Sequence, residues 1–321
     1  MTSNALKLRL AEQEKVDLQA KVKTLEGHVE RLTESIHRHT QAKKHRKLFD
    51  VPKALKRQTG DKVRMICGDT HGSSIDMAAA GQFLADVARV QPDEIVCLGD
   101  HVNCGGFLAE HHVMGYVAET EYSYCEDIAF ANSFFDSLQK AAPQAKIWYL
   151  MGNHEERVER WCVTETHRHT KDAEMLRKVF APEYLLHLHD RGVEYIRRDT
   201  TYGGMAVPGA IRLGKCYFYH GVICPKHACS ANLQKVGGNI CFGHTHRIDA
   251  AFTSLVAVGD IGAWNPGCLC QRQPMWRHGD PTGWTQGELI QLVRPDENFL
   301  TINIPIINGV SLLTPLMAQI A

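Results

Sequence analysis

Five short polar motifs carry the residues of this sequence that could do chemistry. In chain order they are GDTHG at 68–72, GDHVN at 99–103, GNHE at 152–155, YHG at 219–221 and GHTH at 243–246. Their carboxylate, imidazole and amide groups suit divalent transition metals of borderline hardness. The side chains on offer are Asp69, His71, Asp100, Asn153, His154, His220, His244 and His246. A carboxylate has two oxygens, so one aspartate can bridge two ions.

The chemistry that such a ligand set supports is hydrolysis of a phosphate ester. Two ions about 3.5–4 Å apart can share a hydroxide, and metal binding lowers the pKa of water from about 15.7 to near 7. The same ions can hold phosphate oxygens and spread the charge that develops on them. The sequence contains neither a G-x-S-x-G elbow nor a G-x-x-x-x-G-K-[ST] loop. A metal-activated hydroxide therefore replaces a protein nucleophile in this interpretation.

Each motif follows a short apolar run that we expect to be a buried strand. These runs are Arg64–Cys67, Glu94–Leu98, Ile147–Met151, Cys216–Tyr219 and Asn239–Phe242. A helix expected over about 75–90 makes a β-α-β unit of the first two, which predicts a mostly parallel sheet. Ligands bind beyond the carboxyl ends of strands in such sheets, so the motifs should meet along one edge. A second helix is expected over about 122–139, a loop over 262–287, and strands over 284–293 and 299–304.

The composition is that of an ordinary globular protein. The chain has 321 residues with 44% hydrophobic and 22% charged residues and a formal net charge of zero, which excludes wholesale disorder and a global positive field. It has no apolar run of about 18 residues and no apolar N-terminal segment. We therefore expect a cytoplasmic protein without a membrane partner. The 11 cysteines are expected to be buried, reduced thiols, with zinc binding by Cys268-x-Cys270 or Cys224-x₄-Cys229 as the weaker alternative.

Residues 1–40 are predicted to form a coiled-coil helix. Apolar residues follow a 4-3-4-3-4 spacing at Leu18, Val22, Leu25, Val29, Leu32 and Ile36. β-Branched residues alternating with leucine in this way favour a parallel two-stranded coiled coil. We expect a homodimer or higher homo-oligomer through residues 8–39; the alternative is one amphipathic helix lying on the body of the protein. Residues 41–62 are a basic linker, either a phosphate-contacting patch or a solvated connector.

In their order, the five motifs resemble the five blocks of the calcineurin-like metallophosphoesterases. The resemblance covers residues 63 to about 305 and implies an α/β fold, a β-sandwich core flanked by helices, in a domain at 63–321. It also implies a metal-dependent phosphoric ester hydrolase of EC class 3.1 with two divalent ions; manganese is favoured, and iron, zinc or nickel would suit the same ligands. By the family pattern, one metal takes Asp69, His71, Asp100 and His246, and the other takes Asp100, Asn153, His220 and His244. His154 would donate a proton to the leaving oxygen and could also steady the phosphate.

Departures from the family pattern narrow the substrate. Where the Ser/Thr protein phosphatase branch has two arginines that clamp a phosphomonoester, this chain has Cys104 and Met151, and Asn103 replaces the aspartate that orients the histidine. The Asn265–Gly267 segment, NPG, resembles the smaller diesterase and nuclease members. A phosphodiesterase or nuclease acting on DNA is therefore the leading interpretation.

Two further features bear on the substrate. The layout is similar to phage-encoded proteins described as SbcCD-type exonuclease subunits, which would place the protein in a host cytoplasm. Arg157 and Arg160 could reach a phosphate or form a solvated face. Two long inserts, 104–146 and 155–215, are expected to build the substrate pocket, and their aromatic residues could stack bases or pack on the sheet; these are Tyr122, Tyr124, Trp161 and Tyr202. The alternatives are a small-molecule phosphomonoesterase or nucleotidase, a Ser/Thr-type protein phosphatase, and an interaction module with a vestigial site.

Overall fold

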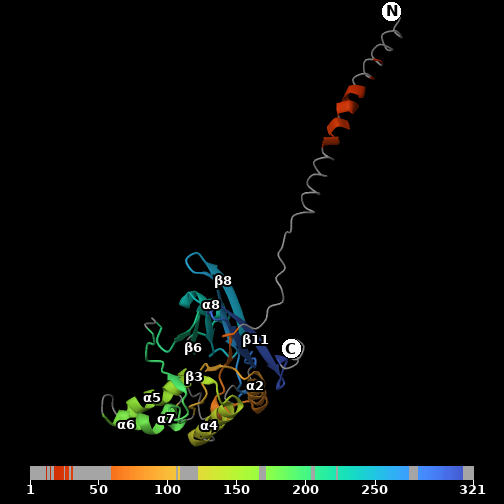
Figure 1. Ribbon diagram of the computed structural model, residues 1–321. Coiled ribbons are helices and arrows are strands. Elements are labelled where there is room, and N and C mark those ends of the chain that lie inside the picture. Colours follow the sequence, from red (N-terminus) through yellow and green to blue (C-terminus); the bar gives the residue numbers. More distant parts are fainter. Residues whose placement is uncertain are drawn as a thin grey trace, which may run out of the picture. The chain divides into compact units, whose positions relative to one another are not determined.

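The computed structural model describes most of the chain in two separate units. The described residues are 59–105, 108, 122–165, 171–203, 207–221, 223–274 and 281–313, together with 12, 15, 18–24, 26–28, 30 and 31. The units are Met1–Arg57 and Gln58–Ala321, and all five motifs lie in the second (Figure 1). In the first unit, residues 18–24 are helical. The remaining heptad positions and the basic linker lie outside the described residues or only partly within them.

Two β-sheets form the core of the second unit. The strands are β1 Lys62–Cys67, β2 Glu94–Cys97, β3 Lys146–Leu150, β4 Glu194–Ile196, β5 Ile211–Leu213, β6 Cys216–Tyr219, β7 Ile240–Phe242, β8 Ile248–Leu255, β9 Gly259–Pro266, β10 Gly287–Val293, β11 Phe299–Ile307 and β12 Val310–Ser311. Seven of them form a sheet in the order β12-β11-β10-β1-β2-β3-β4, and five form a sheet in the order β5-β6-β7-β9-β8. Apolar side chains of both sheets, such as Ile66, Leu150, Phe218 and Phe242, pack into one buried cluster between them.

The sheets are more mixed than the sequence led us to expect. Strands β1 to β4 are parallel, but β10 joins β1 in the antiparallel sense and β11 joins β10 likewise. The loop predicted over 262–287 is wrong in its first part, because Gly262–Pro266 belongs to β9, which pairs with β7 and β8. The glycine and proline of this segment suggested a loop, yet burial of Ile261, Ala263 and Trp264 between the sheets stabilises a strand there.

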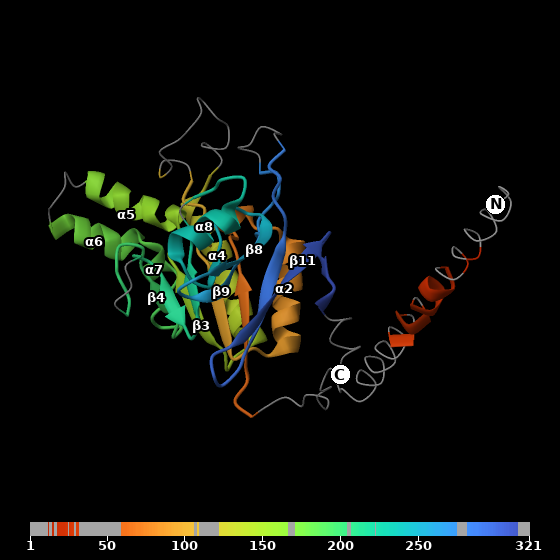
Figure 2. The same ribbon diagram turned by 90° about the horizontal axis from the view of Figure 1, so that it is seen from above.

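Helices cover the sheets from outside (Figure 2). They are α2 Met77–Val90, α4 Tyr124–Ala141, α5 Asn153–Glu165, α6 Lys171–Phe180, α7 Pro182–Leu185 and α8 Ala228–Val236, with a 3₁₀ turn η1 at Gly72–Ser74. Helices α2 and α4 confirm the two predicted helices, and each begins at a capping side chain: Asp76 accepts from the N–H groups of two α2 residues, and Ser123 accepts from Glu126 N–H. Their apolar faces pack on the seven-stranded sheet in a second buried cluster that includes Phe83, Phe135 and Leu138.

The structure also bears on the state of the cysteines and on membrane-spanning helices. All 11 cysteines are free, and all but Cys125 and Cys224 are buried. None of the described helices is long and apolar enough to cross a membrane.

A buried pair of carboxyl groups joins α2 to β10. Glu288 is fully buried, and burial together with the nearby carboxylate of Asp86 raises the pKa of Glu288 to about 9. Asp86 accepts hydrogen bonds from the Gln82 amide and the Ser311 hydroxyl. Neither buried oxygen of Glu288 has a hydrogen-bond partner, and burial without one favours the neutral, protonated carboxyl group.

This pair predicts a pH-dependent stability. Between the ordinary glutamate pKa and about 9, only the unfolded state loses the Glu288 proton, so stability falls by roughly 1.4 kcal/mol per pH unit as the pH rises. We expect Glu288→Gln to flatten the dependence of the urea midpoint on pH between pH 6 and 8.5, compared with wild type. The exposed Glu297→Gln is the matched control. Parallel pH profiles for wild type and Glu288→Gln would contradict the raised pKa of Glu288.

Candidate metal centre

The predicted ligands meet where strands of both sheets end. Asp69 follows β1, Asp100 follows β2, and Asn153 follows β3 at the first residue of α5. His220 follows β6, and the pair His244 and His246 lies between β7 and β8. The expectation that the motifs share one sheet edge is therefore wrong in one respect: the last two motifs come from the five-stranded sheet. The site lies at one end of the sandwich, where the two sheets converge.

Backbone strain is concentrated at these ligands. Nine non-glycine residues among those described have a positive φ, and four of them are predicted ligands: His71, Asp100, His244 and His246. A left-handed conformation costs an ordinary residue about 1 kcal/mol or more, and such costs gather at functional sites. The strain therefore marks the strand tips as a functional site on geometry alone.

The first ligand group contains Asp69, His71 and His246. The Asp69 Oδ2 atom lies 2.8 Å from His246 Nε2 and 3.9 Å from His71 Nε2. The Nε2 atoms of the two histidines are 3.1 Å apart. Two ring nitrogens at this separation need a proton or a cation between them.

The second ligand group contains Asp100, Asn153, His220 and His244. The His220 Nε2 atom lies 2.9 Å from Asn153 Oδ1 and 3.2 Å from Asp100 Oδ2. His220 Nδ1 lies 2.8 Å from the Leu98 carbonyl, to which it can donate, leaving Nε2 free to act as a ligand. His244 joins Asp100 and His220 in one cluster of metal-ligating atoms.

Asp100 belongs to both sides of the site. Its carboxylate is grouped with His71 and His154 on one side and with His220 and His244 on the other. Burial raises the pKa of Asp100, but the nearby histidines His220 and His154 outweigh burial and hold this pKa well below its usual range. Asp100 in turn raises the pKa of His220 to about 9 against the effect of burial. A permanently charged carboxylate between two nitrogen-rich groups is the arrangement expected of a bridging metal ligand.

The donor set fits two divalent ions. Metal–oxygen and metal–nitrogen bonds of about 2.0–2.2 Å place neighbouring ligand atoms roughly 3 Å apart, which matches the separations in both groups. All eight side chains on offer in the sequence, His154 included, are brought together here. The first ion would be held by Asp69, His71, Asp100 and His246 and the second by Asp100, Asn153, His220 and His244.

His154 and Arg157 lie together beside this site. The His154 Nδ1 atom is 2.5 Å from the Asn103 carbonyl, so Nδ1 carries the proton and Nε2 accepts from Arg157 Nη2 at 3.1 Å. Burial, with a contribution from Arg157, lowers the pKa of His154 to about 4. The backbone carbonyl of Asn103, rather than its side chain, thus orients the histidine. Arg160 is exposed, unlike Arg157.

Two further carboxylates, not predicted from the sequence, position the site. Glu155 is fully buried, and its oxygens accept from the backbone N–H groups of Asp100, His101, Val102 and Gly152 and from the Tyr149 hydroxyl. Asp127 of α4 accepts from the N–H groups of Ser73, Asn103 and Cys104 and from the Tyr122 hydroxyl. In the loops that carry the ligands, both carboxylates accept hydrogen bonds from backbone N–H groups that have no carbonyl partner in a helix or strand. Only the place of Glu155 in the GNHE motif could have signalled its role.

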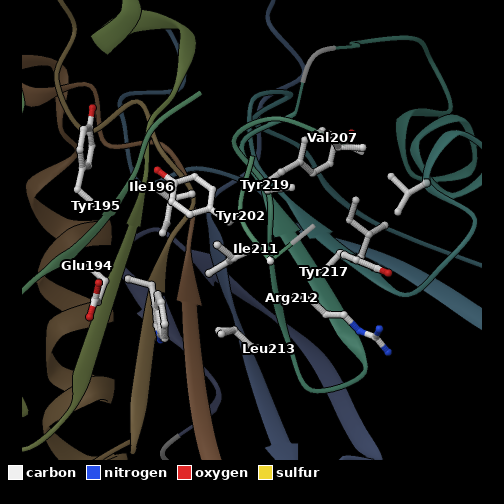
Figure 3. Close-up of a pocket in the computed structure, with 15 residues that line it drawn as sticks. Glu194, Tyr195, Ile196, Tyr202, Val207, Ile211, Arg212, Leu213, Tyr217 and Tyr219 are labelled. Carbon is white, nitrogen blue, oxygen red and sulfur yellow. The ribbon is translucent and has the colours of Figure 1, made fainter. Parts of the chain in front are cut away.

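The aromatic residues of the inserts differ in their surroundings. Tyr122 donates to the buried Asp127, and Trp161 packs against Phe180. Tyr124 donates to the Phe180 carbonyl. These three residues therefore pack within the fold. Tyr202 lies in a cavity of about 690 Å³ between β4 and β5, together with Tyr195 and Tyr217 (Figure 3).

Two glycines of the motifs are required because there is no room for a side chain at their positions. A Cβ atom at Gly152 would lie 2.0 Å from Asp100 Oδ1, and one at Gly243 would lie 2.7 Å from Asp69 Oδ1. Glycine therefore lets the backbone approach the ligand carboxylates from the neighbouring strand tip.

Glu155→Gln is expected to loosen the loop that carries Asp100. Glutamine has one acceptor oxygen in place of two, so buried N–H groups lose their partners at about 1–3 kcal/mol each. We expect a lower melting temperature and a roughly 10–100-fold loss of metal affinity, the usual effect of changing a group that orients a ligand. Metal titration by calorimetry measures the second effect. An unchanged metal affinity in the folded variant would show that Glu155 supports the fold alone; the solvent-side neighbour Glu156→Gln is the control.

A helix-flanked β-sandwich with histidines and aspartates converging on strand tips is typical of metal-dependent phosphoesterases. The chain belongs to the calcineurin-like phosphoesterase family, whose model matches residues 64–247. No curated protein sequence matches this chain.

Three solved structures are among those to which the chain is similar. The chain is similar to vacuolar protein sorting 29 from Cryptosporidium parvum, with 10% identity over 78% of this chain and 94% of that one and a TM-score of 0.39. It is similar to the phosphoesterase YfcE from E. coli, with 16% identity over 75% and 98% and a TM-score of 0.33. It is also similar to Vps29 from Chaetomium thermophilum, with 11% identity over 78% and 93% and a TM-score of 0.34.

Proposed function

We propose that the protein is a phosphodiesterase that uses two divalent ions, preferentially manganese, and acts as a nuclease on DNA. The observation that carries the dinuclear part is the position of Asp100 between two groups of ligands. When bound, such ions supply an activated water molecule and neutralise charge on the phosphate. The remaining steps fall to the residues of this chain.

Arg157 and His154 would bind and protonate the substrate. The guanidinium of Arg157 lies beside His154 Nε2, so one phosphate oxygen could contact both side chains. A phosphate anion at this position favours the protonated ring, because a nearby negative charge raises the pKa of an imidazole. His154 Nε2 would then donate its proton to the leaving oxygen, while the Asn103 carbonyl holds Nδ1.

The cations around the site favour a diester over a monoester. Cys104 and Met151 are both buried, and neither offers a positive charge to a phosphate. Arg157 donates a hydrogen bond to His154 Nε2 and so can offer one positive charge beside the site. A phosphodiester carries one negative charge and a monoester carries up to two, so a site with fewer cations suits the diester.

The substrate class can be tested with metal-free protein reloaded with Mn²⁺. We expect hydrolysis of bis-p-nitrophenyl phosphate and of a labelled DNA strand, and little hydrolysis of p-nitrophenyl phosphate. Cleavage of the monoester with intact DNA would replace the nuclease by a phosphomonoesterase or nucleotidase. Parallel reloading with Fe²⁺, Zn²⁺ and Ni²⁺ identifies the ion that gives the highest kcat/KM.

The N-terminal segment is proposed to hold two copies of the chain together, so that a nucleic acid could be gripped twice. Leu18 and Val22, two of the heptad positions, are 56% and 50% exposed on a helix. Exposed apolar residues at this spacing are typical of a seam that a second helix covers.

Deletion of residues 1–40 is expected to halve the solution mass relative to the full-length dimer. Light scattering coupled to size exclusion measures the mass of both proteins. Leu18→Lys with Val22→Lys is a milder version of the same test that keeps the segment in place. The coiled-coil dimer would be refuted if the full-length protein were a monomer, or if the truncated protein still had the mass of a dimer.

A further inference from the structure

We propose that Cys67, Cys97 and His101 form a third metal site, separate from the strand-tip centre, that holds one thiophilic ion, with Zn²⁺ favoured. The two cysteines are directly opposite each other on the neighbouring parallel strands β1 and β2. Their Sγ atoms are 3.7 Å apart, and the ligating atoms of all three side chains lie within 4.8 Å of one another. Two thiolates bound to one zinc ion at about 2.3 Å, with a tetrahedral angle between the two bonds, would be roughly 3.8 Å apart.

The hydrogen bonds of His101 prepare its second nitrogen to be a ligand. The Thr70 hydroxyl has one proton, which it donates to the His101 carbonyl at 3.2 Å. Thr70 Oγ1 must therefore accept from His101 Nδ1, which lies 2.9 Å away. This leaves a lone pair on Nε2, an atom that is buried and has no hydrogen-bond partner. A histidine whose other ring nitrogen donates to a fixed acceptor is the usual form of a metal ligand.

The surroundings hold the three ligands rigidly and exclude water. Cys67, Cys97 and His101 are all 0% exposed. The His101 ring stacks on Phe134 with centroids 5.5 Å apart and meets the edge of Tyr149 at 5.1 Å. In a dry interior an uncompensated charge is costly, so a neutral assembly is favoured. Zn²⁺ with two thiolates and a neutral imidazole has no net charge, whereas Cu⁺ with the same ligands has a net charge of −1.

Binding is balanced by proton release. Each of the two thiols loses its proton to solvent, and two sulfur–metal bonds and one nitrogen–metal bond form without any change of oxidation state. Because the site is buried, the ion would enter during folding and leave only on unfolding. It would fasten β1 to β2 directly below the residues that follow them, Asp69 and Asp100, and so fix the distance between the two aspartates of the catalytic centre.

A second cysteine pair in this chain supplies a matched control. Cys216 and Cys241 lie on the neighbouring parallel strands β6 and β7, with Sγ atoms 3.8 Å apart, and both are fully buried. No histidine or carboxylate completes a metal-ligating group around them among the described residues. Replacing this pair imposes a comparable change on a buried strand pair without touching the proposed site.

The test is the metal content of the full-length protein after dialysis against EDTA. We expect about one zinc per chain to remain in wild type and in Cys216→Ser/Cys241→Ser, and to be released when wild type is unfolded in guanidinium. Cys67→Ser/Cys97→Ser and His101→Phe should retain less than a tenth of that zinc. Copper in place of zinc would identify Cu⁺ as the ion, and the site would stand.

X-ray absorption on the EDTA-treated wild type keeps the proposal testable even if the cysteine variants do not fold. We expect two sulfur neighbours at about 2.3 Å from the retained ion. The same spectrum from Cys270→Ser must be unchanged, because Cys270 lies near His246 of the strand-tip centre. A wild type that retains no ion, a retained ion with only nitrogen and oxygen neighbours, or equal retention by His101→Phe would overturn the third site. None of these outcomes depends on the substrate of the enzyme.

Discussion

Replacing Asp100 with asparagine is expected to remove almost all phosphoesterase activity. The amide keeps one oxygen for the His154 backbone N–H, which donates to Asp100 Oδ1 at 2.8 Å, so the local fold should survive. It loses the negative charge and the second oxygen with which Asp100 faces both ligand groups. Changes to groups that merely orient metal ligands lower metal affinity or activity roughly 10–100-fold. Loss of the bridging ligand should exceed that range.

Two measurements separate loss of the site from loss of the fold. Activity on bis-p-nitrophenyl phosphate with saturating Mn²⁺ reports the chemistry. The number of manganese ions bound per chain reports the site, and this number should fall below two in the variant. Asp76→Asn is the matched control, because Asp76 caps α2 and asparagine caps a helix equally well. Full activity in Asp100→Asn would refute the two-metal assignment.

Replacing His154 with alanine is expected to affect poor leaving groups far more than good ones. General acid catalysis contributes about 10²–10⁴-fold, and its benefit depends on how much the leaving oxygen needs a proton. A deoxyribose oxygen needs one, whereas p-nitrophenolate is a stable anion. We therefore expect a loss in this range on DNA and a much smaller loss on bis-p-nitrophenyl phosphate.

The comparison of the two substrates defines the role of His154. An equal loss on both would assign His154 to phosphate binding, as a partner of Arg157, rather than to proton transfer. His189→Ala is the control, since His189 is a fully exposed histidine in the same unit. Arg157→Lys, which keeps the charge but not the forked donors, should lower activity on both substrates alike.

Much of the fold could be predicted because its elements carry local signals. The apolar runs before the motifs are strands, and the helices α2 and α4 occur close to the ranges expected for them, 75–90 and 122–139. Sequence reasoning failed at β9, where glycine and proline indicated a loop. Pairing with β7 and β8 and burial of Trp264 determine that strand, and neither is visible in a local window.

The ligand types were predictable, but their positioning was not. Aspartate and histidine two residues apart indicate a metal site wherever they follow a strand. The carboxylates that hold the loops are different, because Asp127 lies on a helix and reaches the ligand loops only through the packing of α4 on η1. The facing cysteines of β1 and β2 are likewise 30 residues apart in sequence, and the strand register brings them together.

The sequence by itself therefore determined the chemical repertoire: which side chains can bind metals, which strands precede them, and which family they resemble. It could do so because these features lie within a few residues of one another. The tertiary structure decided that the motifs come from two sheets, that Asp100 lies between two ligand groups, and that Arg157 contacts His154. Those relations depend on strand order and helix packing, which are set by burial of side chains far apart in the chain.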